Sequence, residues 1–267
     1  MTRIPRILHY VFGLAPDFGG KPWSLVHYAC VKSAIRWIRP DAVTLYYQFQ
    51  PSGPWWDLTK PLLTPVKIEA PDEIFGNPLR HFAHRADVVR LRRLIEHGGI
   101  YLDVDVLVQR DFDDLLDNTM VMGQEGQGER RGLGNAVILA EPNAPFLQHW
   151  METYRLFRGN GVGAFWNEHS VRIPYWLAGK HPEGIKVLSQ RAFFWPLWLE
   201  EHLRWIFDST ERIPLQQAYA SHLWQSLSWR YLEALTPGIV RSRDTNFHRW
   251  IAPYVADLPD DFGASIR

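Results

Sequence analysis

The sequence predicts an α/β fold with a mostly parallel central sheet flanked by helices. Stretches with the two-residue apolar period of strands alternate with stretches of helical period, which is the pattern of parallel strands joined by helical crossovers. The 267 residues are enough for one large domain with a sizeable core. Because the chain shows no internal repeat, low-complexity run or long linker, we expect a single domain over residues 1–267.

The N-terminal part of the chain shows the clearest alternation. Apolar runs rich in β-branched and aromatic residues predict strands, and amphipathic stretches predict helices. These elements are expected at residues 6–12 (strand), 22–38 (helix), 43–49 (strand), 66–70 (strand) and 79–99 (helix). The first helix ends before Pro40, and the second is closed by Gly98 and Gly99, which are common stop signals for a helix.

The stretch GGIYLDVDVLV, residues 98–108, is expected to form the next strand. Every second residue is apolar, so one face belongs in the core: Ile100, Leu102, Val104, Val106 and Val108. The other face then carries Asp103 and Asp105, about 7 Å apart along the strand. Two carboxylates so close repel each other unless a positive charge lies between them. This face is therefore either simply solvated or part of a site that binds a cation.

The rest of the chain gives weaker patterns. A short helix, a strand and a helix are expected at residues 112–117, 135–141 and 143–157, and aromatic-rich loops with short elements follow. Residues 192–207, AFFWPLWLEEHLRWIF, are apolar enough for peripheral contact with a membrane or a lipid-linked molecule. A buried core segment is the stronger interpretation of this stretch.

The composition limits the classes of partner. The formal net charge is zero, so the chain as a whole has no positive field to attract nucleic acid or an anionic membrane. Cys30 is the single cysteine, which rules out an internal disulfide and fits a reducing compartment. The first residues do not resemble a signal peptide, and no stretch reaches the roughly 20 apolar residues of a membrane span. We therefore expect a cytoplasmic protein.

The helix expected at 79–99 places charged residues on a side where leucines would normally pack. At about 100° per residue, Asp87, Arg90 and Leu94 share one side of this helix. The opposite side carries a solvent stripe of Arg85, Arg92 and Glu96. Buried charges persist when they are paired or when they face a polar cavity. Asp87 and Arg90 are therefore either an ordinary i, i+3 ion pair or part of a functional site.

The stretch HRADVVRLRRLIEHGGIYLDVDV, residues 84–106, resembles the signature of the DXD-containing sugar transferases of glycosyltransferase family 32. The matching residues are Ala86, Asp87, Arg90, Gly98, Gly99, Tyr101, Leu102, Asp103 and Asp105. A lone Asp-x-Asp is a weak signal, but the whole string in register is specific. Residues 4–13, 132–142 and 219–229 resemble the family's opening strand, its post-DXD strand and its C-terminal His-x-Trp segment. The chain departs from many members at Val11, where they have a tryptophan.

The resemblance implies a GT-A-like fold for nucleotide-diphospho-sugar transfer, with residues 1–110 as the nucleotide-sugar-binding half and 111–267 as the acceptor-side half. It implies a divalent metal, Mn²⁺ or Mg²⁺, that takes up negative charge on the leaving diphosphate. The co-substrate would be a nucleotide-diphospho-sugar, a UDP-sugar being favoured over a GDP-sugar, and the acceptor a saccharide or a lipid-linked molecule. Retention of the anomeric configuration is also implied. Because the sequence places no carboxylate nucleophile, we expect attack on the same face, with the leaving phosphate taking the acceptor's proton.

The same resemblance implies which residues hold the metal and the donor sugar. Asp105 and Asp103 would bind the metal, and Asp103 would also touch the ribose. His222 would be a third metal ligand or a contact to the diphosphate. Hydroxyl groups of the sugar would be held by Asp87, Arg90 and Asn135. From the residues alone, Asn135 is as well explained as a turn asparagine, and His222 as a core histidine.

Aromatic residues complete the implied donor site. The nucleotide sugar would contact Phe12, Gly13, Tyr101, Asp103, His222 and Trp224. Flat aromatic faces stack on sugar rings, so Trp229 is a second stacking surface beside Trp224. Most of the 13 tryptophans are nevertheless expected to pack in the core or under surface loops.

Two alternatives remain open at the level of sequence. The stretch DVDVL also fits the motif of haloacid-dehalogenase-like phosphatases, with Asp103 as nucleophile and Asp105 as acid. That motif normally lies on the first strand and needs a second acidic cluster, whereas here the pair Asp113–Asp114 follows too soon. The second alternative is a carbohydrate-binding or inactive transferase-like protein. It would use the tryptophans without catalysis and would have no need of two adjacent aspartates.

Overall fold

The computed structural model describes residues 2–264 and is built on a seven-stranded sheet. The strand order is β10-β8-β9-β6-β1-β2-β3. In chain order the strands are β1 Ile7–Val11, β2 Ala42–Tyr47, β3 Thr64–Lys67, β6 Gly99–Leu102, β8 Met120–Glu125, β9 Gly132–Ala140 and β10 Lys186–Leu188. Four neighbouring pairs are parallel, and β9 runs antiparallel to both β6 and β8. The α/β class with a mostly parallel central sheet is confirmed.

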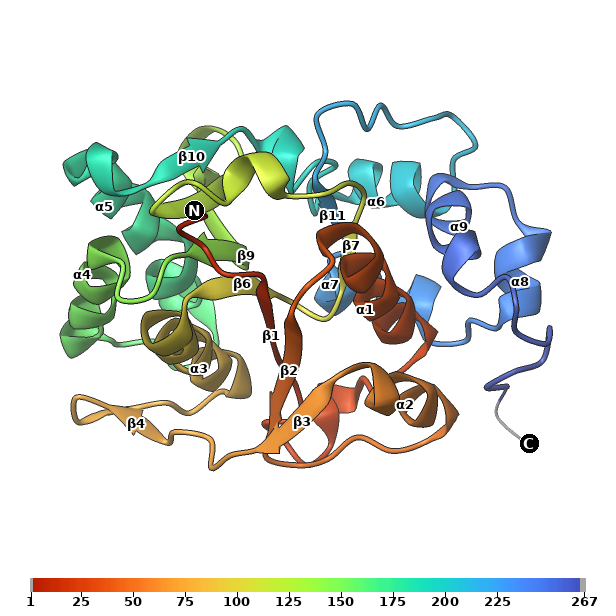
Figure 1. Ribbon diagram of the computed structural model, residues 1–267, viewed down its shortest axis with the longest axis horizontal. Helices are drawn as coiled ribbons and strands as arrows, with labels where there is room; N and C mark the ends of the chain where they lie inside the picture. The colour runs from red at the N-terminus through yellow and green to blue at the C-terminus, as the bar shows by residue number, and fades with distance from the viewer. Residues whose placement is uncertain (1, 265–267) are drawn as a thin grey trace.

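Helices cover both faces of this sheet (Figure 1). The helices of the described chain are α1 Leu25–Ile38, α2 Pro54–Thr59, α3 Phe82–His97, α4 Pro145–Thr153, α5 Ile173–Lys180, α6 Glu200–Phe207, α7 Gln225–Leu232, α8 Pro237–Ser242 and α9 Asn246–Ile251. Helix α1 packs in the same core cluster as Ile100 and Leu102 of β6. Helix α3 packs in a second cluster with Tyr101, which lies between them. Because neighbouring strand residues point to opposite faces, the sheet separates two cores.

Most of the helices and strands predicted from the sequence are present, with ends that differ from the prediction by a few residues. Strands β1, β2, β3 and β9 and helices α1, α3 and α4 occupy the segments where they were expected. The short helix expected at 112–117 is a single 3-10 turn at Asp113–Leu115. Strands β8 and β10 were not predicted, and neither was the small hairpin of β4 (Glu73–Ile74) and β5 (Asn77–Pro78).

The prediction of one continuous strand over residues 98–108 is wrong. Strand β6 ends at Leu102, and residues 103–105 form a turn in which the N–H of Val106 donates to the carbonyl of Asp103 at 3.0 Å. Strand β7 (Val106–Val108) then leaves the central sheet and pairs antiparallel with β11 (Ala220–His222). The two aspartates therefore do not share one strand face. Continued alternation would also place Leu107 on the same face as the two aspartates, but Leu107 is fully buried in the core.

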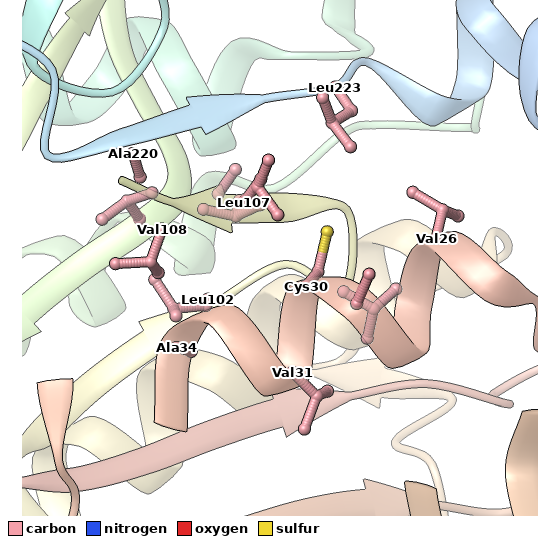
Figure 2. Packing of buried hydrophobic residues seen from close by; sticks show 14 of the residues in the cluster. Val26, Cys30, Val31, Ala34, Leu102, Leu107, Val108, Ala220 and Leu223 are labelled. Atoms are coloured by element: carbon pink, nitrogen blue, oxygen red, sulfur yellow. The ribbon is translucent and has the colours of Figure 1, made fainter. Parts of the chain in front are cut away.

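The β7–β11 pair forms a second, smaller sheet that packs on α1. Figure 2 shows Cys30 of α1 close to β7, with Leu107 and Val108 beside it and Ala220 of β11 beyond. All four side chains are completely buried. Apolar packing thus explains why residues 106–108 carry the hydrophobic pattern of a strand although they belong to another sheet.

The apolar segment 192–207 lies in the core for the most part. Phe193, Phe194 and Ile206 are completely buried, and the half-buried tryptophans of the segment pack against the same core cluster. The core interpretation of this segment therefore holds. Among residues 2–264 no helix is both long enough and apolar enough to cross a membrane.

Candidate active site

The predicted site residues gather at one edge of the central sheet. Strands β1, β6 and β8 run in the same direction and end there, and the antiparallel β9 begins there. Ligands of open α/β sheets bind outside the carboxyl ends of the strands. Asp103 directly follows β6, and Asn135 lies near the start of β9, so the topology brings them to the same edge.

A cleft of about 1190 Å³ opens along this edge. It is lined by every residue that the family resemblance assigned to the catalytic, donor and metal sites: Phe12, Gly13, Asp87, Arg90, Tyr101, Asp103, Asp105, Asn135, His222 and Trp224. Trp229 is different, since it does not line the cleft and packs against the main core cluster. Its position gives no support to the stacking role that the sequence suggested.

Three potential metal ligands lie together in the cleft. One oxygen each of Asp103 and Asp105 and one ring nitrogen of His222 lie within 4.8 Å of one another. His222 comes from β11, whose pairing with β7 places it opposite Val106, the residue after Asp105. Carboxylate oxygens suit hard cations such as Mg²⁺ and Mn²⁺, and imidazole also suits transition metals. The chemistry of these donors therefore fits the divalent cation that the sequence predicted.

Asp105 is held in place by its own hydrogen bonds. Its Oδ2 accepts from the backbone N–H of Gln225 at 2.7 Å and lies 3.3 Å from Nε2 of His222. Burial alone would raise the pKa of Asp105, but His222 and the Gln225 N–H outweigh it and lower the pKa. Burial likewise acts to lower the pKa of His222, but the nearby carboxylates, Asp105 first, raise it. Asp105 is thus kept ionised, as a metal ligand must be.

Asp87, Arg90 and Asn135 form an interlocked group beside the DXD turn. The Asn135 side-chain amide donates to Asp87 Oδ1 at 2.7 Å, and Arg90 Nη1 donates to the Asn135 carbonyl at 2.7 Å. Arg90 also lies 3.4 Å from Asp87 Oδ1 and 3.2 Å from Asp103 Oδ1. The Tyr101 hydroxyl donates to Asp103 Oδ1 at 2.6 Å. The charged side of α3 expected from the sequence is therefore part of the cleft wall.

The charges in this group offset the effect of burial on the pKa of Arg90 fully and on that of Asp87 only in part. Burial lowers the pKa of Arg90, but Asp103, Tyr101 and Asp87 together raise it above the ordinary value. Burial raises the pKa of Asp87, against the opposing effect of Arg90. Each aspartate of the DXD turn therefore has its own cationic or donor partner. The expected repulsion between Asp103 and Asp105 is thus relieved by the protein itself, in addition to any metal.

Aromatic side chains line the N-terminal wall of the cleft. Phe12 stacks on Phe18 with ring centroids 5.5 Å apart and an angle of 10° between the planes. Gly13 has φ +69°, and a Cβ there would lie 2.2 Å from the carbonyl oxygen of Phe49, so this tight turn requires glycine. Val11 is buried and does not replace the family's tryptophan as an exposed surface.

Sequence reasoning missed three residues of the site. Phe18 supplies the ring that stacks on Phe12, Gln225 supplies the N–H that binds Asp105, and Glu125 places a further carboxylate in the cleft. Glu125 ends β8, which begins with the short buried run Met120–Met122 and has no alternation of apolar and polar residues. The sequence therefore did not predict this strand or the site residue at its end. Gln225 acts through its backbone, which leaves no signal in the side chain.

The comparisons with known proteins agree with this geometry. Residues 61–122 match the family model described as "Glycosyltransferase sugar-binding region containing DXD motif". Glucan organizing enzyme 1 of Cryptococcus neoformans var. grubii is 38% identical over 269 residues, which covers 97% of this chain and 72% of that protein. An uncharacterized protein of Arabidopsis thaliana is 38% identical over 73 residues, 27% of this chain and 11% of its own. The structure of the bifunctional glycosyltransferase WbbM matches with a TM-score of 0.54 at 11% identity, covering 97% of this chain and 50% of that one.

The fold and the cleft are therefore those of a glycosyltransferase. The chain belongs to the family of glycosyltransferases with a DXD sugar-binding region. WbbM, at its low identity, supports the fold alone. Membership of a transferase family displaces the alternative of a phosphatase that would use Asp103 and Asp105.

Proposed function

We propose that this enzyme transfers a hexose from a nucleotide-diphospho-sugar to a saccharide acceptor with the help of a divalent cation. The main support for the proposal is that two groups of residues lie side by side in one cleft. The Asp103, Asp105 and His222 atoms fit a cation, and the Asp87–Arg90–Asn135 group beside them offers the donors and acceptors that hydroxyl groups need.

Different residues of the cleft bind different parts of the nucleotide sugar. When bound, the cation supplies a Lewis acid that neutralises charge developing on the leaving diphosphate. Asp105, Asp103 and His222 hold it, and Arg90 and Asp87 orient the hexose by directed hydrogen bonds. Phe12 and Phe18 offer their rings to the nucleoside base, and Trp224 lies beside His222 with ring centroids 4.1 Å apart. We favour a UDP-sugar over a GDP-sugar, with Mn²⁺ or Mg²⁺ as the cation.

The acceptor and the stereochemistry are further parts of the proposal. The name of the Cryptococcus neoformans relative supports glucan-type saccharides as the first acceptors to try. We propose that the anomeric configuration is retained. The acceptor oxygen bonds to the anomeric carbon on the face that the diphosphate leaves, and the leaving phosphate oxygen takes the proton of the attacking hydroxyl. The family resemblance supports this route.

Binding of nucleotide sugars tests the proposal directly. With Mn²⁺ present we expect one nucleotide sugar to raise the melting temperature, because a ligand that binds only the folded state stabilises it. The panel contains UDP-glucose, UDP-galactose, UDP-N-acetylglucosamine and GDP-mannose, with UDP and GDP alone. The stabilising donor should also release its nucleotide diphosphate slowly in water. A protein that binds and hydrolyses none of them with Mn²⁺ or Mg²⁺ contradicts the proposal.

Replacing His222 with glutamine should weaken binding of Mn²⁺ by about 10-fold or more. Glutamine keeps a hydrogen-bonding group but has no imidazole nitrogen to bind the metal. Electron paramagnetic resonance of free Mn²⁺ measures the bound fraction without any turnover. The matched control is His149→Gln, because His149 is exposed and outside the cleft. Unchanged Mn²⁺ affinity together with weaker binding of the nucleotide diphosphate would place His222 on the diphosphate instead.

A further inference from the structure

Glu125 is a carboxylate in the cleft to which no role has been assigned so far. It is the last residue of β8 and therefore reaches the same sheet edge as Asp103 and Asn135. Its side chain is half-buried and lines the cleft. It lies close enough to Asp103 and His222 to interact with both electrostatically. Glu125 thus lines the same cleft as the metal-binding atoms and the Asp87–Arg90–Asn135 group.

The position of this carboxylate depends on a glycine in the neighbouring strand. A Cβ on Gly134 would lie 2.6 Å from Glu125 Oε2 and 2.4 Å from the Phe194 ring, both too close for van der Waals contact. The backbone of Gly134 is not in the left-handed region, so glycine is needed there for space rather than for conformation. Gly134 directly precedes Asn135. Strand β9 therefore both leaves space for the Glu125 carboxylate, at Gly134, and carries a proposed sugar contact, Asn135.

The Glu125 carboxylate differs from the other acids of the cleft in its lack of a partner. Within residues 2–264, the Glu125 side chain accepts no hydrogen bond from the protein, and the charges of His222 and Asp103 act on it. Asp87, Asp103 and Asp105, in contrast, each accept a hydrogen bond from the protein. A half-buried carboxylate oxygen that no protein donor binds is free to accept a hydrogen bond from a molecule in the cleft. Such a group at the wall of a binding cleft indicates that a ligand supplies the donor.

We propose that Glu125 accepts a hydrogen bond from a hydroxyl group of the donor sugar and thereby determines which hexose the enzyme prefers. The inference rests on the proposed function. A carboxylate repels the diphosphate, whereas the hexose is neutral and carries several hydroxyl donors. The hexose, rather than the ribose, is the part of the donor that we assign to Glu125, because Gly134 beside the Glu125 carboxylate directly precedes Asn135, a proposed contact of the hexose. Because epimeric hexoses differ in the direction of one hydroxyl, a fixed acceptor can distinguish them.

Two variants of Glu125 test the inference by calorimetric binding with Mn²⁺. Glu125→Ala removes the acceptor, and Glu125→Gln keeps one acceptor oxygen without charge. We expect the alanine variant to bind the preferred nucleotide sugar about 10-fold or more weakly, and the glutamine variant to lose less. Binding of the corresponding nucleotide diphosphate should not weaken in either, because both variants remove a negative charge that repels it. The ratio of affinities for UDP-glucose and UDP-galactose should shrink in both, which a merely structural role would not cause.

A control variant and three contrary results separate the proposed role of Glu125 from other roles. Glu73→Gln makes the same chemical change on the exposed hairpin outside the cleft and should leave binding as in the wild type. Equal weakening of diphosphate and nucleotide-sugar binding would overturn the inference and place Glu125 near the metal. An unchanged hexose preference, or a large fall in the melting temperature of ligand-free Glu125→Gln, would overturn it in favour of a structural role. Wild-type protein that binds no nucleotide sugar contradicts the proposed function itself.

Discussion

Asp105→Asn should lower sugar transfer by about 1,000-fold or more, because the cleft would no longer hold the cation that neutralises the leaving diphosphate. Asparagine has nearly the shape of aspartate and keeps an oxygen that can accept from the Gln225 N–H, which lies 2.7 Å from Asp105. The start of α7 should therefore keep its contact, and the variant should fold. The measurement is the rate of transfer, or of donor hydrolysis, at saturating Mn²⁺, with the melting temperature taken alongside.

The structure makes asparagine a better test than alanine at this position. Alanine would also remove the acceptor for Gln225, so a loss of activity could reflect a local change at the start of α7. Asp117→Asn is the matched control, since Asp117 is exposed and outside the cleft. Wild-type enzyme in excess EDTA should lose activity and regain it with Mn²⁺. Full transfer by Asp105→Asn, or in EDTA, would contradict the metal-dependent mechanism.

The part of the site carried by regular elements could be predicted from the sequence. Helical periodicity placed Asp87 and Arg90 on the packed side of α3, and both are buried in the cleft wall. The glycines after the helix predicted an immediate turn into β6. These inferences depend on local periodicity, which predicts secondary structure reliably when the helix or strand is long.

The rest could not be predicted, for two physical reasons. The alternation of apolar residues runs without interruption through Val104 and Val106, so it cannot reveal that β6 ends and β7 enters another sheet. The contact between His222 and Asp105 depends on the pairing of β11 with β7, which are far apart in the sequence. Glu125 lies at the end of a strand whose apolar part is only the three buried residues Met120–Met122, too short a run to distinguish a strand from any other core segment.

Arg90→Lys should lower transfer by about 100-fold or more while binding of the free nucleotide diphosphate remains nearly unchanged. The Arg90 guanidinium contacts three groups at the same time: Nη1 contacts the Asn135 backbone carbonyl and Asp103, and Nη2 contacts Asp87. A lysine ammonium keeps the charge but is a single point on a flexible chain. It cannot hold Asp87 and Asp103 together, so the hydroxyl-binding surface beside the metal should lose its geometry. Transfer kinetics and calorimetry of diphosphate binding measure the two effects separately.

Lysine is the informative substitution because the positive charge must stay. Alanine would leave Asp87 and Asp103 without their buried cation, which costs about 3–5 kcal/mol of folding free energy and would confuse catalysis with stability. Arg92→Lys, on the exposed side of the same helix, controls for the exchange itself. If diphosphate and nucleotide-sugar binding weaken equally in Arg90→Lys, Arg90 binds the phosphates rather than the sugar. If diphosphate binding, nucleotide-sugar binding and transfer are all normal in Arg90→Lys, Asp87 and Arg90 are a structural ion pair. An arginine that orients the hexose cannot lose its planar guanidinium without slowing transfer.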